Sequence, residues 1–252
     1  QQVVGGRSCL GAPFRPSSGA IVMRLSVVVP ARNEERSLPT CLEALRRQTL
    51  KEFELIVVDS ASSDRTGEIA RAFGAKVVRL EEPGLTRARQ AGFEAAKGDV
   101  IASTDADTIV PPDWLERLTA PFSKPKVVGT YGDVIYGDEL KALAWYFNSG
   151  RRFFNVFGFG GLPGQNFAVR RSAFEAVNGF YTPKGNLVYG YPEYEDLWLG
   201  LKLRRVGRLV AIPKLYVLSS PRRFKSSKTI LYYFRGAPRM TRMLWWATIG
   251  RQ

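Results

Sequence analysis

Between residues 25 and 104 the chain alternates short apolar runs with stretches of helical periodicity. Four runs are rich in Val, Ile and Leu and are continuous: LSVVV (25–29), ELIVV (54–58), KVVRL (76–80) and DVIAST (99–104). Continuous apolar runs are typical of strands that are buried on both faces. Because the stretches between them repeat apolar residues at helical spacing, the pattern predicts an α/β fold with a mostly parallel sheet flanked by helices.

The helical stretches have recognisable ends. Apolar residues share one face in three of them: Leu38, Leu42 and Leu45; Ile69 and Phe73; Ala88, Gly92 and Ala95. Ser37 and Asp64 stand at the N-cap positions of the first two stretches, and Gly98 follows the third as a stop signal.

Beyond residue 127 the pattern becomes less regular. Residues 129 to 164 mix glycine with aromatic residues, as in a substrate-facing loop region or a helix that embraces a substrate. Residues 165 to 180 indicate a strand, a turn and a short helix. Residues 193 to 213 indicate a helix, a terminator at Gly207 and a last strand.

The composition fits one large domain. The chain has 252 residues, of which 45 % are apolar. We interpret residues 1 to 22 as an irregular leader, 23 to 220 as the α/β domain, and 221 to 252 as a basic, aromatic tail. Two cysteines, Cys9 and Cys41, provide neither a zinc cluster nor a disulfide framework.

The chain contains no histidine. Ser-His-Asp and Cys-His sites, histidine-ligated zinc and histidine bases are therefore excluded. Acid–base or metal chemistry must then rest mainly on carboxylates, which prefer hard cations such as Mg²⁺ or Mn²⁺.

The net charge of +14 is concentrated near the C-terminus. Residues 197 to 252 contain no Asp or Glu, and their basic residues are interleaved with Trp, Tyr and Phe. Such a segment fits an anionic membrane surface at least as well as nucleic acid. Pro238 divides the tail, which predicts two short amphipathic helices. No apolar run approaches the roughly 20 residues that span a bilayer.

Acidic residues stand where predicted strands end. Asp105 and Asp107 follow the run 99–104, and Asp59 follows the run 54–58. Ligands of parallel α/β sheets bind beyond the carboxyl ends of the strands. Two carboxylates on such a turn fit a divalent cation that keeps sites free for phosphate oxygens. The alternative is an acidic turn whose side chains only cap backbone groups.

Other polar residues are candidates for the same cleft. Glu34 and the backbone N–H groups of PARNEE (30–35), together with Asp59, are candidate nucleoside contacts. Arg87 and Arg89 either reach a phosphate or lie on a helix surface. Glu195 and Asp196 stand at a predicted helix start, where the helix dipole alone favours acids. Their functional interpretation is a general base, because no histidine is present to deprotonate a hydroxyl.

Five segments together resemble the motifs of family 2 glycosyltransferases, which have the GT-A fold. They occur in that family's order over roughly residues 24 to 215. The segments are SVVVPARNEERSLPTCLEAL, ELIVVDSASSDRT, ARQAGFEAAKGDVIASTDADT, GQNFAVRRSAFEAVNGF and YEDLWLGLKLRRVG. The resemblance implies a Rossmann-like GT-A sheet and an inverting transfer from a nucleoside-diphosphate sugar, without a covalent intermediate.

The resemblance also assigns roles by position. Nucleoside contacts fall on Pro30, Ala31, Glu34 and Asp59, and Arg89 falls among the donor-binding residues. Asp105 would contact the ribose or the metal, and Asp107 would ligate Mn²⁺ or Mg²⁺ at the diphosphate. Asp196 of the ED motif would be the catalytic base and Glu195 a supporting acid. The expected donor is a UDP- or GDP-sugar.

The expected acceptor is lipid-linked or a glycan, and the expected location is peripheral, at the cytoplasmic face of a membrane. The QxxRW motif of processive polysaccharide synthases is not present, so processive synthesis is in doubt. SPRRF (220–224) stands near its place. Arg222 or Arg223 would approach the donor diphosphate there, with a membrane-facing basic loop as the alternative.

Two other functions compete with a transferase. One is a non-catalytic α/β module that binds anionic lipid or nucleic acid through its basic tail. The paired acids weigh against it, because a pure binder does not need acids in its cleft, and nucleic acid is the less expected partner. The other is a sugar nucleotidyltransferase, which usually needs a glycine-rich loop after the first strand, and PARNEE has no glycine.

Overall fold

The computed structural model describes residues 23–137, 140–156, 161–182, 186–187 and 194–225. The leader at 1–22 and the tail from 226 lie outside the described residues. The elements follow in this order: β1 (Leu25–Ala31), α1 (Leu38–Arg46), β2 (Glu54–Ser60), α2 (Thr66–Ala72), β3 (Lys76–Leu80), α3 (Leu85–Ala95), β4 (Val100–Ser103), β5 (Thr108–Ile109), α4 (Trp114–Thr119), η1 (Ala120–Ser123), β6 (Val127–Ile135), α5 (Lys141–Val156), β7 (Phe167–Arg170), α6 (Arg171–Ala176), α7 (Glu195–Leu203), β8 (Arg208–Ser219) and η3 (Pro221–Lys225).

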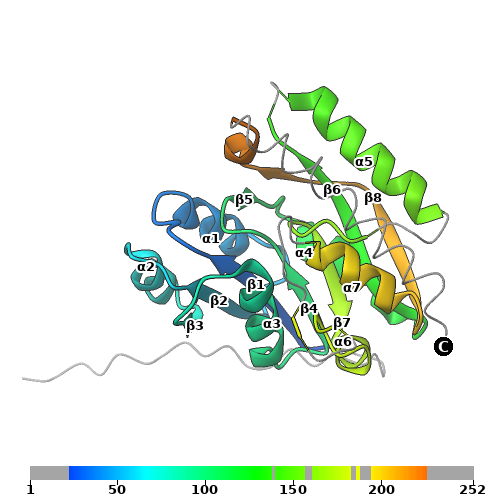
Figure 1. Ribbon diagram of the computed structural model, residues 1–252, viewed down its shortest axis with the longest axis horizontal. Helices are drawn as coiled ribbons and strands as arrows, with labels where there is room; N and C mark the ends of the chain where they lie inside the picture. The colour runs from blue at the N-terminus through cyan, green and yellow to red at the C-terminus, as the bar shows by residue number, and fades with distance from the viewer. Residues whose placement is uncertain (1–22, 138–139, 157–160, 183–185, 188–193, 226–252) are drawn as a thin grey trace, which may run out of the picture.

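The strands form one eight-stranded sheet in the order β3-β2-β1-β4-β7-β6-β8-β5 (Figure 1). β1 pairs in parallel with β2 and β4, and β2 pairs in parallel with β3. β7 runs antiparallel to its neighbours β4 and β6, while β6 and β8 are parallel and β5 is antiparallel to β8. The predicted mostly parallel sheet is confirmed, and the parallel half brings the ends of β1, β2 and β4 to one edge.

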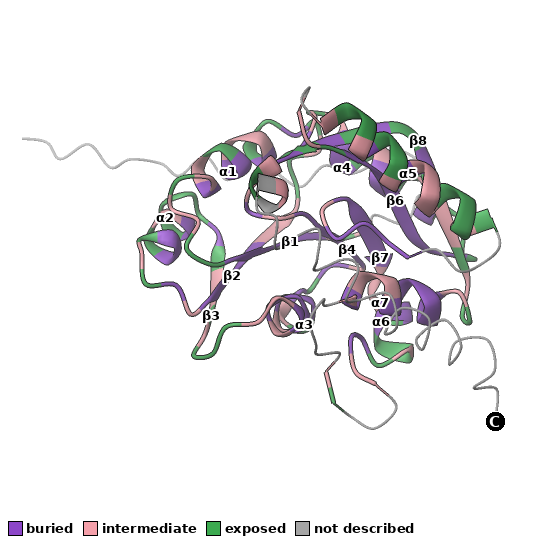
Figure 2. Ribbon diagram, turned by 45° about the horizontal axis from the view of Figure 1, so that its top comes forward, coloured by how far each residue is buried: buried purple, intermediate pink, exposed green. Residues whose placement is uncertain are grey.

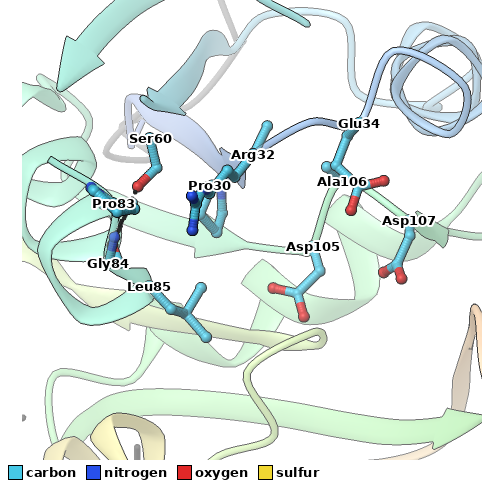
Figure 3. A pocket seen from close by; sticks show the side chains of 12 residues that line it. Pro30, Arg32, Glu34, Ser60, Pro83, Gly84, Leu85, Asp105, Ala106 and Asp107 are labelled. Carbon is cyan, nitrogen blue, oxygen red and sulfur yellow. Dashed lines mark hydrogen bonds between the residues drawn. The ribbon is translucent and has the colours of Figure 1, made fainter. Parts of the chain in front are cut away.

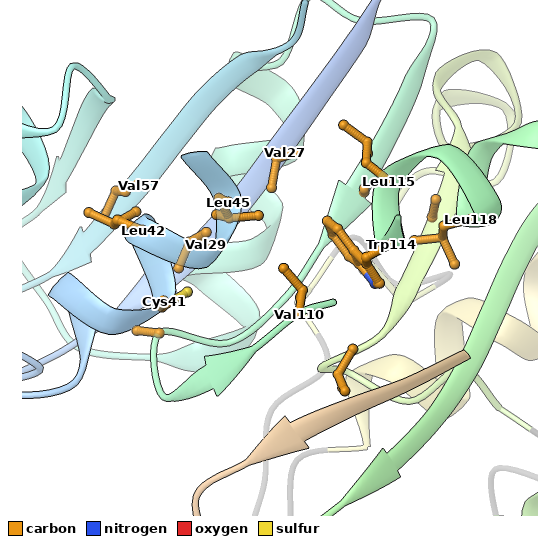
Figure 4. Close-up of a cluster of buried hydrophobic side chains, with 14 of the residues drawn as sticks. Val27, Val29, Cys41, Leu42, Leu45, Val57, Val110, Trp114, Leu115 and Leu118 are labelled. Atoms are coloured by element: carbon orange, nitrogen blue, oxygen red, sulfur yellow. The ribbon is translucent and has the colours of Figure 1, made fainter. Parts of the chain in front are cut away.

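Helices cover both faces of the sheet. On one face, the side chains of α1 and α4 share a cluster with Val27 of β1 and Val57 of β2, in which Trp114 of α4 is fully buried (Figure 4). On the other face, α3, α6 and α7 pack around Ile56, Phe93 and other apolar side chains. Neighbouring residues of β1 alternate between the two clusters, so every side chain of that strand after Leu25 is buried (Figure 2). This explains why β1, β2 and β4 appear as continuous apolar runs. The expectation is wrong for β3, which is an edge strand with no buried residue.

The structure corrects several boundaries. β1 and β2 extend two residues further than their apolar runs, so Ala31, Asp59 and Ser60 belong to strands. Ser37 is the N-cap of α1 but makes no side-chain cap hydrogen bond. The N-cap of α2 is Arg65 and not Asp64, although the Asp64 side chain accepts a hydrogen bond from the Thr66 amide at 3.0 Å. The irregular stretch 129 to 164 contains the end of β6 and the helix α5, so its helical interpretation is correct in part.

Two glycines inside helices have opposite surroundings. A Cβ at Gly92 of α3 would lie 2.3 Å from Val28 Cγ1, whereas a Cβ at Gly150 of α5 would meet open space. We expect Gly92→Ala to lower the free energy of unfolding by about 1–3 kcal/mol through overpacking. The matched control, Gly150→Ala, is expected to raise it by about 0.5–1 kcal/mol, because glycine costs backbone entropy in a helix. Urea denaturation measures both, and equal effects at the two positions would contradict this assignment of the packing.

Candidate active site

A cleft of about 480 Å³ opens at the carboxyl ends of β1, β2 and β4 (Figure 3). The loops after β1 and β2 lead to α1 and α2 on one face of the sheet, whereas the Pro83–Leu85 turn after β3 leads to α3 on the other face, and the cleft opens between them. Of the candidate residues, those that line it are Pro30, Ala31, Glu34, Asp105 and Asp107. The sequence did not single out the rest of the lining, which includes Ser60 and the Pro83–Leu85 turn at the start of α3.

Asp105 and Asp107 lie on the turn between β4 and β5. The turn is closed by the Thr108 amide, which donates to the Asp105 carbonyl at 3.1 Å, and the Cys41 thiol of α1 donates to the same carbonyl at 3.5 Å. The two carboxylates have exposed fractions of 15 % and 22 %, so both are largely shielded yet open to the cleft. Burial, together with the neighbouring charge of Asp105, raises the pKa of Asp107, and this is opposed by Arg222.

Arg89 lies between two carboxylates and is itself buried. Its guanidinium donates to Asp105 at 2.6 Å and to Glu195, so it joins the turn after β4 to the first residue of α7. Burial alone would lower its pKa, but the charges of Asp105 and Glu195 outweigh burial and raise it. The expectation for Arg89 is therefore corrected: its side chain is 2 % exposed and bound by protein carboxylates, so it supports the cleft and is not presented to a phosphate.

Asp196 follows Glu195 in the first turn of α7, as predicted for the ED pair. Its carboxylate accepts hydrogen bonds from the Gly164 amide at 3.1 Å and the Leu197 amide at 2.7 Å. Gly164 must be glycine here, because a Cβ at this position would lie 2.5 Å from an Arg89 nitrogen. Gly164 thus donates to the Asp196 carboxylate and leaves room for the Arg89 guanidinium.

Asp59 differs from its expectation. It lies at the end of β2, but its carboxylate is fully buried, accepts hydrogen bonds from Arg79 and the Ser62 amide, and is not part of the cleft lining. The PARNEE backbone also has internal partners. The amides of Asn33, Glu34 and Glu35 donate to side chains of the loop between β2 and α2. These amides tie the two loops together and so are not presented to a nucleoside.

Arg222 reaches the cleft from η3. Its guanidinium donates to Glu34 at 2.7 Å and to Asp107 at 3.0 Å, which places a positive charge where a donor diphosphate is expected. Arg223 is the next residue of η3, but its side chain lies outside the described residues. A donor contact by either arginine stays a prediction.

Residues 26–177 match the family model described as Glycosyl transferase family 2. The chain belongs to this family. Among curated relatives, it is 39 % identical over 106 residues to the undecaprenyl-phosphate 4-deoxy-4-formamido-L-arabinose transferase of Pseudomonas fluorescens, a match that covers 38 % of this chain and 31 % of the relative. The chain spans only about a third of the length of the curated relatives that it matches first. Membership in the family favours a glycosyltransferase over a nucleotidyltransferase.

Solved glycosyltransferases share the fold. The mannosyltransferase PcManGT of Pyrobaculum calidifontis, solved with GDP-Man and Mn²⁺, superposes with a TM-score of 0.62 at 21 % identity, covering 86 % of this chain and 64 % of that one. Glucosyl-3-phosphoglycerate synthase of Mycobacterium tuberculosis, solved with Mn²⁺, UDP and its product, gives 0.60 at 21 % identity, covering 88 % of this chain and 86 % of that one. The predicted GT-A fold is thereby confirmed.

The carboxylates of this family 2 protein fit a divalent cation. Within the described residues no group of three His, Cys, Asp or Glu side chains could hold a metal on its own. Asp105 and Asp107 supply hard oxygen donors from one turn, which suits an ion that also takes phosphate oxygens and water. The raised pKa of Asp107 supports the fit, because a bound cation would compensate the charge that burial disfavours.

The pKa of Asp107 makes a prediction for stability. A carboxyl whose pKa is raised on folding favours the folded state below its ordinary pKa of 3.8 and loses that contribution as the pH rises through the raised value. With chelator present, we expect Asp107→Asn to melt at a higher temperature than the wild type at neutral pH, by about 2–4 °C per kcal/mol recovered. The difference should shrink as the pH falls below 3.8.

Differential scanning calorimetry between acidic and neutral pH measures this difference. The matched control is Asp113→Asn, since Asp113 is an exposed acid before α4 and far from the cleft lining. A less stable Asp107→Asn protein at neutral pH would show that the charge of Asp107 supports the fold.

Proposed function

We propose that the protein is a metal-dependent, inverting glycosyltransferase that moves a hexose from a UDP- or GDP-sugar to a hydroxyl acceptor. The observation that supports this most is the Arg89 bridge, which holds a carboxylate of the donor turn and the start of the base-bearing helix in one cleft. A nucleotide-sugar transferase needs both groups on opposite sides of one reacting carbon.

The donor would lie along the cleft floor. Pro30 and Ala31 would contact the nucleoside, with Ser60 beside them. Asp107, with Asp105, would hold Mn²⁺ or Mg²⁺, which stabilises the charge on the departing diphosphate when bound. Arg222 would exchange Glu34 and Asp107 for the oxygens of the diphosphate. Glu34 would then face the nucleoside, and Asp107 would face the metal.

The transfer would be a single displacement. The acceptor hydroxyl oxygen forms a bond to the anomeric carbon while the bond from that carbon to the diphosphate oxygen breaks, and the nucleoside diphosphate leaves. Asp196 accepts the hydroxyl proton, with its carboxylate already oriented by two backbone amides. Attack opposite the leaving group inverts the anomeric centre through an oxocarbenium-like transition state.

Glu195 would act as a positioning residue. Its carboxylate is 2 % exposed and bound to Arg89, so the acceptor does not reach it directly. A charge buried in this way fixes the first turn of α7 and therefore the place of Asp196.

The acceptor is proposed to be lipid-linked or membrane-proximal. A relative that matches part of the chain is named as an undecaprenyl-phosphate sugar transferase, which supports a lipid-linked acceptor. We place the transferase domain at residues 23–220, the basic aromatic tail at 221–252, and the protein at the inner face of a membrane. Within the part of the chain that the structure describes, no helix has the length and hydrophobicity to cross a bilayer.

The donor site is tested by thermal shift. A ligand that binds only the folded state stabilises it by about 2.7 kcal/mol at 100 times its dissociation constant. We expect one of the UDP- or GDP-sugars to raise the melting temperature of the wild type only with Mn²⁺ present, and Asp107→Ala to lose this increase. Asp113→Ala should retain it. No response to any nucleotide sugar would count against a donor site in this cleft.

The base is tested separately. Asp196→Asn keeps the size of the side chain and one of its two acceptor oxygens, but removes the group that accepts the proton. We expect kcat to fall by about 10²–10⁴-fold while nucleotide affinity stays near that of the wild type. Product release from the donor that the thermal shift identifies gives the rate, and Asp113→Asn serves as the control. Normal turnover by Asp196→Asn would refute the assignment of the base.

A further inference from the structure

Helix α5 turns its apolar side toward solvent. Trp145 is 71 % exposed and Val156 is 82 % exposed, and Tyr146, Phe153 and Phe154 are exposed as well (Figure 2). At about 100° per residue, Trp145, Tyr146, Phe153 and Val156 lie within about 100° of one another, which makes a continuous stripe. A stripe of this width normally packs against a core.

The opposite side of α5 mixes apolar and polar residues: Ala144 and Asn148 are its buried side chains, and the contacts of Asn148 explain why this side turns inward. β7 ends its pairing with β6 at Tyr131, so among the described residues no strand pairs with β6 beyond that point on that side. The Asn148 side chain takes this place: its amide nitrogen donates to the Val134 carbonyl at 2.8 Å, and its oxygen accepts from the Val134 amide at 3.2 Å. Arg152 pairs with buried Asp133 nearby. The inner face therefore places a polar side chain, Asn148, next to apolar Ala144.

Basic residues accompany the exposed stripe. The helix contains Lys141, Arg151 and Arg152 and no acidic residue. Arg204 of the α7 C-cap donates to Asn155 at the C-terminal end of α5, which adds another guanidinium to that end. A helix with Trp, Tyr and Phe on one side and basic residues at its flanks has the composition of segments that lie in the headgroup region of anionic bilayers.

We propose that α5 is the element that docks this protein on an anionic lipid surface, with its aromatic stripe in the interface. Trp and Tyr have amphipathic rings that settle at the level of the headgroups, and Arg and Lys meet the anionic lipids. A second copy of the chain and the tail 226–252 are the other occupants that would cover an apolar stripe. The tail contains no acid to meet the basic flank. A second copy carries scattered surface acids such as Glu82 and Glu175, each already paired with an arginine, whereas an anionic bilayer supplies a continuous negative surface.

The position of α5 connects this surface to the cleft, a step that rests on the proposed function. Phe147 stacks on Phe224 of η3 with ring centroids 6.0 Å apart, and η3 carries Arg222 to Asp107. At the other end, Asn155 donates to the Gly161 carbonyl in the loop that holds Asp196. A membrane under α5 would therefore present a lipid-linked hydroxyl close to both sides of the cleft.

Vesicle flotation tests the surface. The double variant Trp145→Gln, Phe153→Gln removes two exposed aromatics, which we expect to lower partitioning onto phosphatidylglycerol-containing vesicles on the order of tenfold or more. The matched control is Phe73→Gln, Tyr216→Gln, which removes two exposed aromatics from an apolar groove of about 780 Å³ formed largely by α1, β5 and β8. The control should float like the wild type. Wild-type flotation by the α5 variant, or loss only in the control, overturns the proposal.

A conservative variant locates the contact. Trp145→Phe keeps the stripe apolar, so flotation should persist, but lipids brominated on their acyl chains should quench less of the total tryptophan fluorescence than in the wild type. Unchanged quenching would mean that other tryptophans enter the bilayer, with Trp245 and Trp246 of the tail as the candidates, and would overturn the role of α5. If the wild type does not float but forms a dimer, and the double variant is monomeric, the stripe serves self-association. This outcome would also overturn the proposal.

The two proposals fail in different measurements. Metal-dependent stabilisation by the nucleotide sugar should be the same in the α5 double variant and the wild type, because no residue of α5 lines the cleft. If that stabilisation is absent everywhere while flotation depends on α5, the donor assignment is wrong and the lipid surface stands.

Discussion

A buried guanidinium fixes the geometry on which the cleft depends. Arg89 on α3 contacts Asp105 after β4 and Glu195 on α7, residues that are 16 and 106 positions away in the sequence. Removing one partner of a buried ion pair typically costs 3–5 kcal/mol, because the other charge then stays buried without compensation. These ion pairs therefore hold α3, the turn after β4 and α7 together, although no strand pairing joins these segments directly. Gly164 permits this arrangement by leaving room for the guanidinium.

The same charges explain why the proposed donor needs a cation. Glu34, Asp105 and Asp107 contribute carboxylates to the cleft lining, and Arg89 is already engaged by protein groups. A diphosphate entering this field would be repelled by Asp105 and Asp107 unless a divalent ion lay between them. The raised pKa of Asp107 reflects the same unfavourable charge. The apoprotein therefore gives up some stability at the turn that the proposed metal would occupy.

Much of the fold could be predicted because its determinants are local. Strands buried on both faces need continuous β-branched runs, and Asp105 and Asp107 follow the β4 run directly, so their place at the sheet edge is predictable. The roles of Asp59 and Arg89 were not predictable in this way. Both stand in the right region, but their side chains are bound by Arg79 and by Asp105 and Glu195, partners that only the tertiary structure supplies. The Pro83–Leu85 lining has no chemical signal in the sequence.

Helix α5 shows a different limit of the sequence. Its periodicity indicates two faces, and the usual assumption would turn the aromatic one inward. Asn148 reverses this orientation. The backbone N–H and C=O of Val134 have no strand partner among the described residues, and the Asn148 side chain supplies the acceptor and the donor that they require. A buried backbone group without a partner costs about 1–3 kcal/mol, so the side of α5 that carries Asn148 and Ala144 turns inward and the side that carries Trp145 and Phe153 remains in solvent. The exposed stripe is thus a consequence of how the sheet edge is satisfied, and a lipid surface would bury the aromatic area that the fold itself leaves uncovered.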